Sequence, residues 1–249
     1  MSTYPKYTYE IPLVDFNLDC YRRVKTAALC DFLQVGATVH AERLGVGMLD
    51  LQASGLTWMI AKMDIAFENW PRPKDTLSLE TWPSGVRGHL ICNRDFLMRD
   101  SAGNVVLRAR SEWVVVNWET RHVAKLTPAL MALAPVDVPR VEMPEMPVFD
   151  AKSLAGGGEV LLPVRRADLD LNMHVNNVHY IEWIFEPLPD EAYRRSLKRL
   201  SITYHAEARA GETVASSYSE TALEGGGFVT SHALKRDGTA LTKATCVWA

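Results

Sequence analysis

The chain has 249 residues, of which 47% are hydrophobic and 23% are charged. This composition is close to the average of globular proteins and excludes a collagen-like, a disordered and a disulfide-dense chain. Its length exceeds the usual domain size of about 100 to 150 residues, which favours two fused units. The net charge of −3 gives no broad basic surface, so nucleic acid is not an expected partner.

Targeting and cysteine signals are few. The chain shows no basic stretch followed by an apolar one near its start, no apolar run near the ~20 residues of a membrane span, and no transit-like segment rich in Arg and Ser. These observations predict a cytoplasmic location and no membrane span. The cysteines form no Cys-x-x-Cys pair, which predicts reduced core thiols rather than a zinc site. They are Cys20, Cys30, Cys92 and Cys246.

The first half is expected to contain one helix followed by strands. The segment AALCDFLQVGATVHA predicts the helix, and TLSLETW, HLICNRDFLMR and VVLRARSEWVVVNW predict the strands. Turns are expected at Pro83-Ser84-Gly85 and at Ser101-Ala102-Gly103-Asn104. Aromatic side chains bury large areas, so the tryptophans of these runs are expected to line the core or a pocket. They are Trp58, Trp70, Trp82 and Trp113.

A stretch rich in proline and glycine separates the two halves. It contains Pro139, Pro144 and Pro147 and ends with three glycines, from Gly156 to Gly158. Proline removes backbone donors and blocks a continuous helix. The sequence therefore predicts an N-terminal unit over residues 1–135, a linker over 136–158 and a C-terminal unit over 159–249.

The second half repeats the order of the first. After the strand EVLLPVRR, the segment NNVHYIEWIFE has apolar residues at helical spacing, with an asparagine to cap its start and Pro187 to stop it. The run from Leu200 to Ala206 alternates like a strand, and Asp237-Gly238 predicts a hairpin. Aligning KMDIAFENWPRPKDTLSLETWP with RLSITYHAEARAGETVASSYSE places Thr76 opposite Thr213. One helix laid on a curled antiparallel sheet, formed twice, predicts an α+β fold.

Three polar residues stand at alternate positions just before the second helix: Asp170, Asn172 and His174. In an extended segment, alternate side chains project to one side. The free amides at a helix N-terminus favour developing negative charge. A carboxylate, an amide and an imidazole at that place predict a catalytic site. The alternative is a loop in which Asp and Asn only satisfy backbone groups beside the cap.

The run DLDLNMHVNNVHYIEW resembles the motif of the acyl-ACP thioesterases of plants and bacteria, and the resemblance continues through GLTWMIAKMDIAFENWP. It implies a tandem hotdog fold, an acyl chain held by the first unit, chemistry in the second, and an acyl carrier protein bearing a fatty acyl chain as partner. The catalytic Asp, Asn and His of the family fall on Asp170, Asn172 and His174. A later glutamate of the family falls on Glu207, and Ala208 stands where the family has a cysteine.

The resemblance, taken with Ala208, predicts hydrolysis to a free fatty acid by activated water. A thioester carbonyl is reactive enough for a positioned water, a general base and donors for the oxyanion, so neither a metal nor a cofactor is expected. We predict Glu207 as the base or water-positioning carboxylate and Asn172 and His174 as groups that orient water and substrate. Asp170 fixes His174 or shares the role of base.

Three other functions compete with this prediction. A hotdog dehydratase would show an H-x-F-P-G-type segment, which neither half contains, and a non-catalytic acyl-thioester binding protein would lack the polar cluster. An acyl-CoA thioesterase stays open, as does a homodimer. Two basic clusters either meet an acidic carrier or are solvated helix faces. They are Arg22, Arg23 and Lys25 in the first half and Arg194, Arg195, Lys198 and Arg199 in the second.

Overall fold

The computed structural model describes residues 6–133, 138–153 and 155–249. The chain divides into two compact units, Met1–Met143 and Pro144–Ala249, called unit 1 and unit 2 below. The predicted linker bounds of 136–158 stay a prediction, and residues 136, 137 and 154 of it lie outside the described residues. Within the described ranges, no helix is long and apolar enough to cross a membrane.

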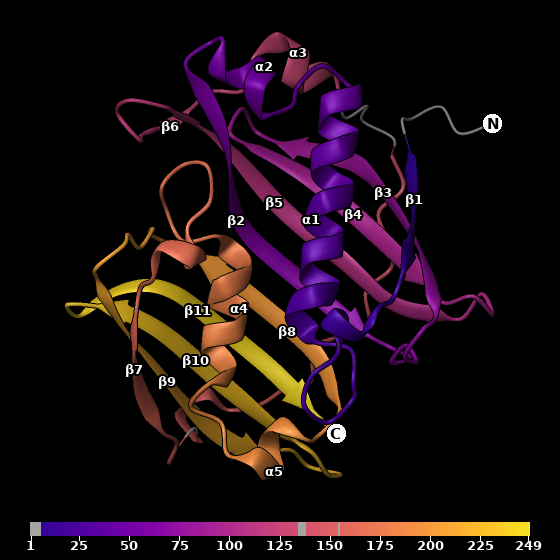
Figure 1. Ribbon diagram of the computed structural model, residues 1–249, viewed down its shortest axis with the longest axis vertical. Coiled ribbons are helices and arrows are strands. Elements are labelled where there is room, and N and C mark those ends of the chain that lie inside the picture. The colour runs from indigo at the N-terminus through magenta and orange to yellow at the C-terminus, as the bar shows by residue number, and fades with distance from the viewer. Residues whose placement is uncertain (1–5, 134–137, 154) are drawn as a thin grey trace. The chain divides into compact units, whose positions relative to one another are not determined.

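Unit 1 is an antiparallel sheet with a long helix, α1, on one face (Figure 1). The strands lie in the order β1-β3-β4-β5-β2, and the short β6 pairs with β5. The strands are β1 (Tyr7–Pro12), β2 (Leu56–Phe67), β3 (Thr76–Arg87), β4 (Ile91–Arg99), β5 (Val105–Asn117) and β6 (Val123–Ala124). The helices are α1 (Thr26–Arg43), α2 (Met48–Gln52) and α3 (Pro128–Ala132), preceded by a 3₁₀ turn at Asp15–Asn17.

The first predicted helix is confirmed as α1, two residues longer at its end and one at its start. Its buried residues recur every three or four positions, as expected for a helix with one face on a sheet. Gly36 allows this approach, because a Cβ there would lie 2.8 Å from Cδ2 of Leu79 on β3. The small residue thus sets how closely α1 lies on the sheet.

The turn predicted at Pro83-Ser84-Gly85 is wrong. β3 continues through these residues, with a register shift against β4 between Pro83 and Gly85 and a φ of 126° at Gly85. Proline and glycine are tolerated in a strand at a bulge, where one residue leaves the ladder. The chain reverses later, at Gly88, where φ is 61°.

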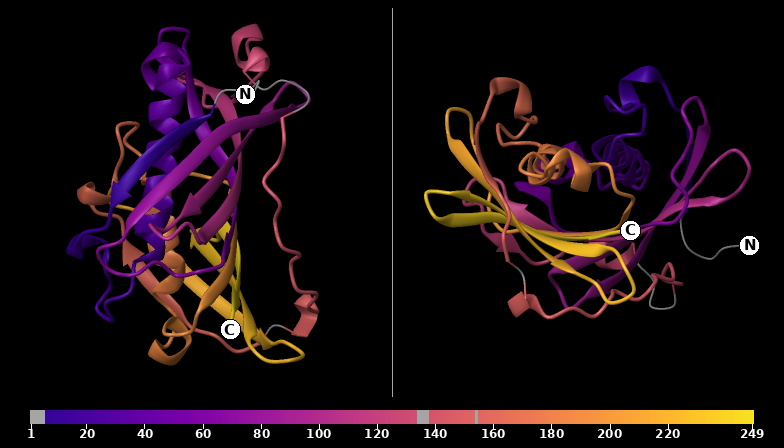
Figure 2. Two further views of the ribbon diagram at one scale, coloured as in Figure 1. Left: turned by 90° about the vertical axis from the view of Figure 1, so that its right-hand side faces the viewer. Right: turned by 90° about the horizontal axis from the view of Figure 1, so that it is seen from below.

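Unit 2 has the same arrangement, with α4 on the concave face of its sheet (Figure 2). Its strands lie in the order β7-β9-β10-β11-β8, and all neighbours are antiparallel. They are β7 (Glu159–Pro163), β8 (Leu197–Tyr204), β9 (Thr213–Ala222), β10 (Phe228–Arg236) and β11 (Thr239–Trp248). The helices are α4 (Asn177–Phe185) and α5 (Asp190–Tyr193), with 3₁₀ turns at Ala151–Ser153 and Arg166–Asp168.

Several sequence predictions for unit 2 are confirmed. Asn176 caps α4, since its side chain accepts a hydrogen bond from the amide of Val178 at 3.1 Å. Asp237 and Gly238 join β10 to β11 with φ of 49° and 77°, as a two-residue hairpin turn requires. The repeat is also confirmed, because Thr76 begins β3 as Thr213 begins β9 and the two sheets share one strand order.

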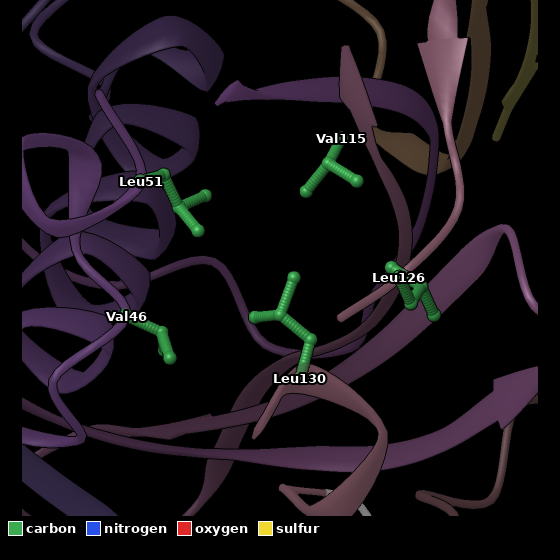
Figure 3. Close-up of a cluster of buried hydrophobic side chains, with 5 residues drawn as sticks. All are labelled: Val46, Leu51, Val115, Leu126 and Leu130. Carbon is green, nitrogen blue, oxygen red and sulfur yellow. The ribbon is translucent and has the colours of Figure 1, made fainter. Parts of the chain in front are cut away.

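The interior of unit 1 includes an apolar cluster to which α2 and α3 each contribute a leucine (Figure 3). Trp58 packs against this cluster, donates from Nε1 to the carbonyl of Val46 at 2.9 Å and meets Trp113 edge-on at 6.4 Å. Trp58 therefore has the predicted core position, and Trp113 is partly buried beside it. The buried members of the cluster are Val46, Leu51, Val115, Leu126 and Leu130.

Candidate active site

The segment that carries Asp170, Asn172 and His174 forms a tight turn, and the expected extended conformation is wrong. The amide of Asp170 donates to the carbonyl of His174 at 2.8 Å, and the amide of Met173 donates to the carbonyl of Asp170 at 3.1 Å. Met173 has a φ of 61°. A left-handed residue reverses the chain here, so the three side chains are placed by the turn and not by strand alternation.

The carboxylate of Asp170 holds this turn closed. Its Oδ1 accepts from the amides of Asn172 at 2.8 Å and His174 at 3.4 Å, and its Oδ2 accepts from Nδ2 of Asn172 at 3.3 Å. An aspartate that bonds the amides two and four residues ahead is a common stabiliser of turns. These contacts favour a positioning role for Asp170 over the role of base.

The structure brings His174 and Glu207 together. Nε2 of His174 lies 3.4 Å from Oε2 of Glu207, and the two side chains are 10% and 27% exposed. β8 ends at Tyr204, so Glu207 lies in the loop that follows this strand rather than in a strand. The imidazole and the carboxylate, from segments far apart in sequence, thus form one pair.

The loop that carries Glu207 is fixed at three points. Nη1 of Arg236 donates to the carbonyl of Glu207 at 3.0 Å. The amide of Ala208 donates to the hydroxyl of Tyr180 on α4 at 2.8 Å, and the carbonyl of Ala208 accepts from the amide of Val175 at 3.0 Å. The loop is therefore tied both to the helix and to the turn before it, which fixes the backbone beneath the Glu207 carboxylate.

Three buried polar atoms of this region have no hydrogen-bond partner among the described residues: Oδ1 of Asn172, Nδ1 of His174 and Oδ1 of Asn177. Buried polar groups are nearly always bonded, so such atoms need a water or a substrate as partner. Asn177 was not among the predicted site residues. The cap of α4 is Asn176, so the side chain of Asn177 does not have that role.

The N-terminus of α4 lies three residues beyond His174. Asn177 is the first helical residue, and its amide has no partner inside the helix, as at the start of any α-helix. The hydroxyl of Tyr204 donates to the carbonyl of Asn177 at 3.3 Å and holds this end of the helix. An amide at a positive helix end suits an oxyanion.

Unit 1 contains the same turn without the same side chains. Oδ1 of Asp19 accepts from the amides of Tyr21 at 2.8 Å and Arg23 at 2.9 Å, and Arg22 has a φ of 62°. Tyr21 and Arg23 stand where unit 2 has Asn172 and His174. Nη2 of Arg23 lies 3.0 Å from Oδ2 of Asp19, so an ion pair occupies this copy. The Leu-Asp pairs 18–19 and 169–170 are the sequence signal that could have shown this second repeat.

Burial raises the pKa of three of the four cysteines. Ala208 is buried, and so are Cys30 and Cys246, whose pKa values burial raises far above the ordinary thiol value. Burial also raises the pKa of Cys92, to about 11. Within the part of the chain that the structure describes, no group of three or more His, Cys, Asp or Glu residues is placed to hold a metal ion.

The two basic clusters are not helix faces. α5 ends at Tyr193, so Arg194 and Arg195 follow this helix, and Lys198 and Arg199 lie in β8. Arg199 is buried and donates to the carbonyl of Pro144 at 2.7 Å. The first-half cluster lies in the Asp19 turn just before α1, with Arg23 paired to Asp19 and Nζ of Lys25 donating to the carbonyl of Phe16. Neither cluster forms the predicted basic helical face.

Comparison with known proteins defines the class of fold first. An acyl-ACP thioesterase from Bacteroides thetaiotaomicron superposes with a TM-score of 0.79 at 24% identity, covering 98% of each chain. The 12:0-ACP thioesterase from Umbellularia californica superposes with a TM-score of 0.83 at 23% identity, covering 98% of this chain and 94% of that one. The expected tandem hotdog fold is confirmed.

The family follows from the sequence matches. Residues 3–134 match the acyl-ACP thioesterase N-terminal domain, and residues 152–249 match the C-terminal domain. The chain therefore belongs to the acyl-ACP thioesterase family. It is 31% identical to oleoyl-acyl carrier protein thioesterase 1, chloroplastic, of Arabidopsis thaliana, over 97% of this chain and 75% of that protein. It spans 60% of the length of the related thioesterase 2 of the same plant, at 32% identity.

Proposed function

We propose that the protein hydrolyses acyl-ACP thioesters, releasing a free fatty acid and the carrier with its thiol restored. The observation that carries the proposal is the His174–Glu207 pair at 3.4 Å, set beside buried polar atoms without partners and a helix N-terminus. Relatives of the chain are named as oleoyl, palmitoyl and dodecanoyl acyl-carrier-protein thioesterases or hydrolases. Release of the acyl chain would end a round of fatty acid synthesis.

Glu207 is the proposed general base. Its carboxylate takes a proton from a water whose oxygen attacks the thioester carbonyl carbon, and the carbonyl oxygen becomes an oxyanion. When the tetrahedral intermediate collapses, the carbon–sulfur bond breaks and the leaving thiolate takes up the proton. The side chain of Ala208 offers no thiol, so the chain has no cysteine beside Glu207 to act as nucleophile.

The other three predicted residues have supporting roles in this proposal. The imidazole of His174 orients the Glu207 carboxylate and the water through Nε2. Asn172 offers Oδ1 to the water or substrate, because Nδ2 already bonds Asp170. The amide and side chain of Asn177 face the oxyanion. The carboxylate of Asp170 stabilises the turn that positions Asn172 and His174.

A thioester panel tests the proposal against its closest alternative. Purified protein is offered acyl-ACP and acyl-CoA thioesters of graded length, and free thiol is followed with time. We expect turnover of acyl-ACP at higher kcat/KM than acyl-CoA of the same chain. Faster use of acyl-CoA would identify an acyl-CoA thioesterase, and binding without turnover of either would identify an acyl-thioester binding protein.

Two further predictions concern the cell and the assembly. The plant relatives named above are chloroplastic, so the cytoplasmic location stays a prediction. A homodimer likewise stays a prediction. Cell fractionation tests the location, and light scattering of the purified protein tests the homodimer.

A further inference from the structure

The peptide group between Glu207 and Ala208 is held from both sides. Its carbonyl, which belongs to Glu207, accepts from Nη1 of Arg236 on β10 at 3.0 Å. Its N–H, which belongs to Ala208, donates to the hydroxyl of Tyr180 on α4 at 2.8 Å. A peptide group is planar, so hydrogen bonds to its carbonyl and to its N–H fix the orientation of the plane. This orientation constrains the direction in which the Glu207 side chain leaves the backbone.

The hydroxyl of Tyr180 is itself firmly placed. Tyr180 is 3% exposed, and its ring lies 5.6 Å from that of Trp183 and 6.0 Å, edge-on, from that of Tyr204. Burial raises the pKa of Tyr180 to about 12, so the hydroxyl is neutral at pH 7. A neutral hydroxyl can accept the hydrogen bond of an amide. The packing of the ring therefore determines where the Ala208 amide is held.

The same helix carries the amide that faces the oxyanion in the proposed reaction. Asn177 begins α4, and Tyr180 follows it by three residues, a spacing that makes them neighbours on the helix surface. Tyr204 contacts both, since its hydroxyl donates to the carbonyl of Asn177 at 3.3 Å and its ring meets that of Tyr180. One short helix thus holds the loop of the proposed base and presents the amide for the oxyanion.

A helix packed on such a sheet does not require this hydroxyl, as unit 1 shows. Lys25 is the N-cap residue of α1 and Asn176 that of α4, so Leu29 and Tyr180 match, each four residues beyond its cap. Leu29 is fully buried, as a core residue of its helix. Unit 1 therefore fills the matching position with an aliphatic side chain that can accept no hydrogen bond.

Unit 1 also lacks the carboxylate that the hydroxyl would position. Trp70 lies three residues beyond the end of β2, as Glu207 lies three residues beyond the end of β8. Nε1 of Trp70 donates to the carbonyl of Val24 at 3.1 Å, so a side chain of the loop itself ties it to the turn. The tyrosine hydroxyl thus occurs in the unit that has the glutamate and is absent from the unit that does not.

We propose that Tyr180 is a positioning residue of the reaction. Its hydroxyl holds the peptide group between Glu207 and Ala208 at a fixed distance from the N-terminus of α4, so that the base and the oxyanion amide address the same substrate carbonyl. Tyr180 acts through Glu207 and exchanges no proton with the substrate. The inference rests on the proposed hydrolysis with Glu207 as the base.

A double-mutant cycle tests this coupling. Steady-state kinetics on one acyl-ACP substrate is measured for the parent, Tyr180→Phe, Glu207→Gln and the double variant. Tyr180→Phe should lower kcat by about tenfold to 100-fold, because a small displacement of the base is costly, with KM within about twofold of the parent. In the Glu207→Gln background the same change should lower kcat by less than about twofold, since the group that it positions is already lost.

Tyr218→Phe is the matched control. Tyr218 lies on β9 of the same unit, its ring stacks on His232 at 6.0 Å, and its hydroxyl has no hydrogen-bond partner among the described residues. This variant should keep the kcat of the parent. Tyr180→Leu, which introduces the residue of unit 1, should lose activity as Tyr180→Phe does while still folding by circular dichroism.

The outcomes separate this inference from the proposed function. A parent that turns over no acyl-ACP contradicts the hydrolysis itself. An active parent whose kcat is unchanged in Tyr180→Phe would overturn the inference alone. So would an equal fold-loss in the parent and Glu207→Gln backgrounds, because Tyr180 would then act on something other than the base.

Hydrogen exchange of the Ala208 amide gives a second measurement that needs neither turnover nor a variant. Ala210 supplies the reference, because it is exposed and its amide has no hydrogen-bond partner in the described part of the chain. In the parent, the Ala208 amide should exchange at least about 100-fold more slowly than that of Ala210, and Tyr180→Phe should remove most of this protection. Equal exchange of the two amides in the parent would refute the proposal.

Discussion

The imidazole Nε2 of His174 lies 3.4 Å from the carboxylate Oε2 of Glu207, joining the turn before α4 to the loop after β8. If Glu207 is the base, Glu207→Gln keeps the shape but removes the proton acceptor. We expect kcat to fall by about 10² to 10⁴-fold, and Glu207→Asp to recover part of this loss. Steady-state kinetics on one acyl-ACP substrate measures it. A Glu207→Gln rate within about threefold of the parent, far below the range of a general base, would remove Glu207 from the mechanism.

Asp170 and Asp19 form a matched pair, because each holds the same turn in its own unit. Asp170→Ala should lower both kcat and the melting temperature, since the turn that presents Asn172 and His174 opens. Asp19→Ala should lower the melting temperature by a similar amount, with kcat at the parent level. Each change removes turn hydrogen bonds worth about 1 kcal/mol apiece. Equal loss of kcat in both variants would show that Asp170 acts only on the fold.

Asn176 and Asn177 are neighbours with different expected roles. Asn176→Ala removes the cap of α4 and should cost about 1 kcal/mol of stability with a modest change in kcat. Asn177→Ala leaves the cap and should lower kcat strongly at nearly constant stability, because it removes a buried polar side chain that faces no protein partner. Thermal melts and steady-state kinetics on both variants measure the contrast. Full activity of Asn177→Ala would exclude it from the site.

Thiol reagents should spare the activity. Cys20 is exposed, whereas Cys30 and Cys246 are buried with pKa values raised by burial, so iodoacetamide should modify Cys20 first. Mass spectrometry locates the modified residue, and kcat should stay near the parent value after one modification. The variant Ala208→Cys should gain no new covalent route. Inactivation of a protein still folded by circular dichroism would contradict the water mechanism.

His232 makes unit 2 sensitive to acid. Burial lowers its pKa from 6.5 to about 4 in the folded state. The unfolded chain therefore binds more protons between these values, so stability rises with pH across the window and is lost as the pH falls from about 6.5 to about 4. The loss is at most about 3 kcal/mol. Phe96 holds the matching place in unit 1, since it pairs with Ala109 as His232 pairs with Ala244.

The variant His232→Phe gives unit 2 the neutral side chain that unit 1 has at the matching position. It should reduce the fall in melting temperature between pH 6.5 and pH 4, measured by calorimetry, without removing it. The remaining slope belongs in part to His40, whose pKa burial also lowers to about 4. An unchanged slope in His232→Phe would mean that this histidine is already protonated in the folded state.

The sequence alone predicts the parts of the fold that local patterns determine. The apolar spacing of α4, the cap at Asn176 and the turn at Asp237-Gly238 are each specified by neighbouring residues, and each is confirmed. Pro83 and Gly85 predicted a turn but form a bulge in β3. Proline and glycine occur in both structures, and only the pairing of β3 with β4 distinguishes a bulge from a turn. Pairing depends on residues distant in sequence.

The site was harder to predict than the fold. The place of Asp170, Asn172 and His174 just before a helix suggested them as candidates. The expected extended conformation was wrong, because Met173 has a left-handed φ and the segment forms a turn. The burial of the Asn177 side chain was not predicted from the sequence, because it depends on the tertiary contacts of α4. The contact of the Tyr180 hydroxyl was not predicted either, because its partner, the amide of Ala208, lies in a distant segment of the chain.

The paired turns at Asp19 and Asp170 bear on how such a chain can diverge. In a homodimer of single units, one gene encodes both copies, so every substitution appears in both and each copy must retain the residues that the other needs. Here the two copies are encoded separately. Arg23 can replace the imidazole in one turn while His174 is retained in the other, and Leu29 can occupy in one helix the position that Tyr180 has in the other. Duplication within one chain lets each half be selected for its own chemistry.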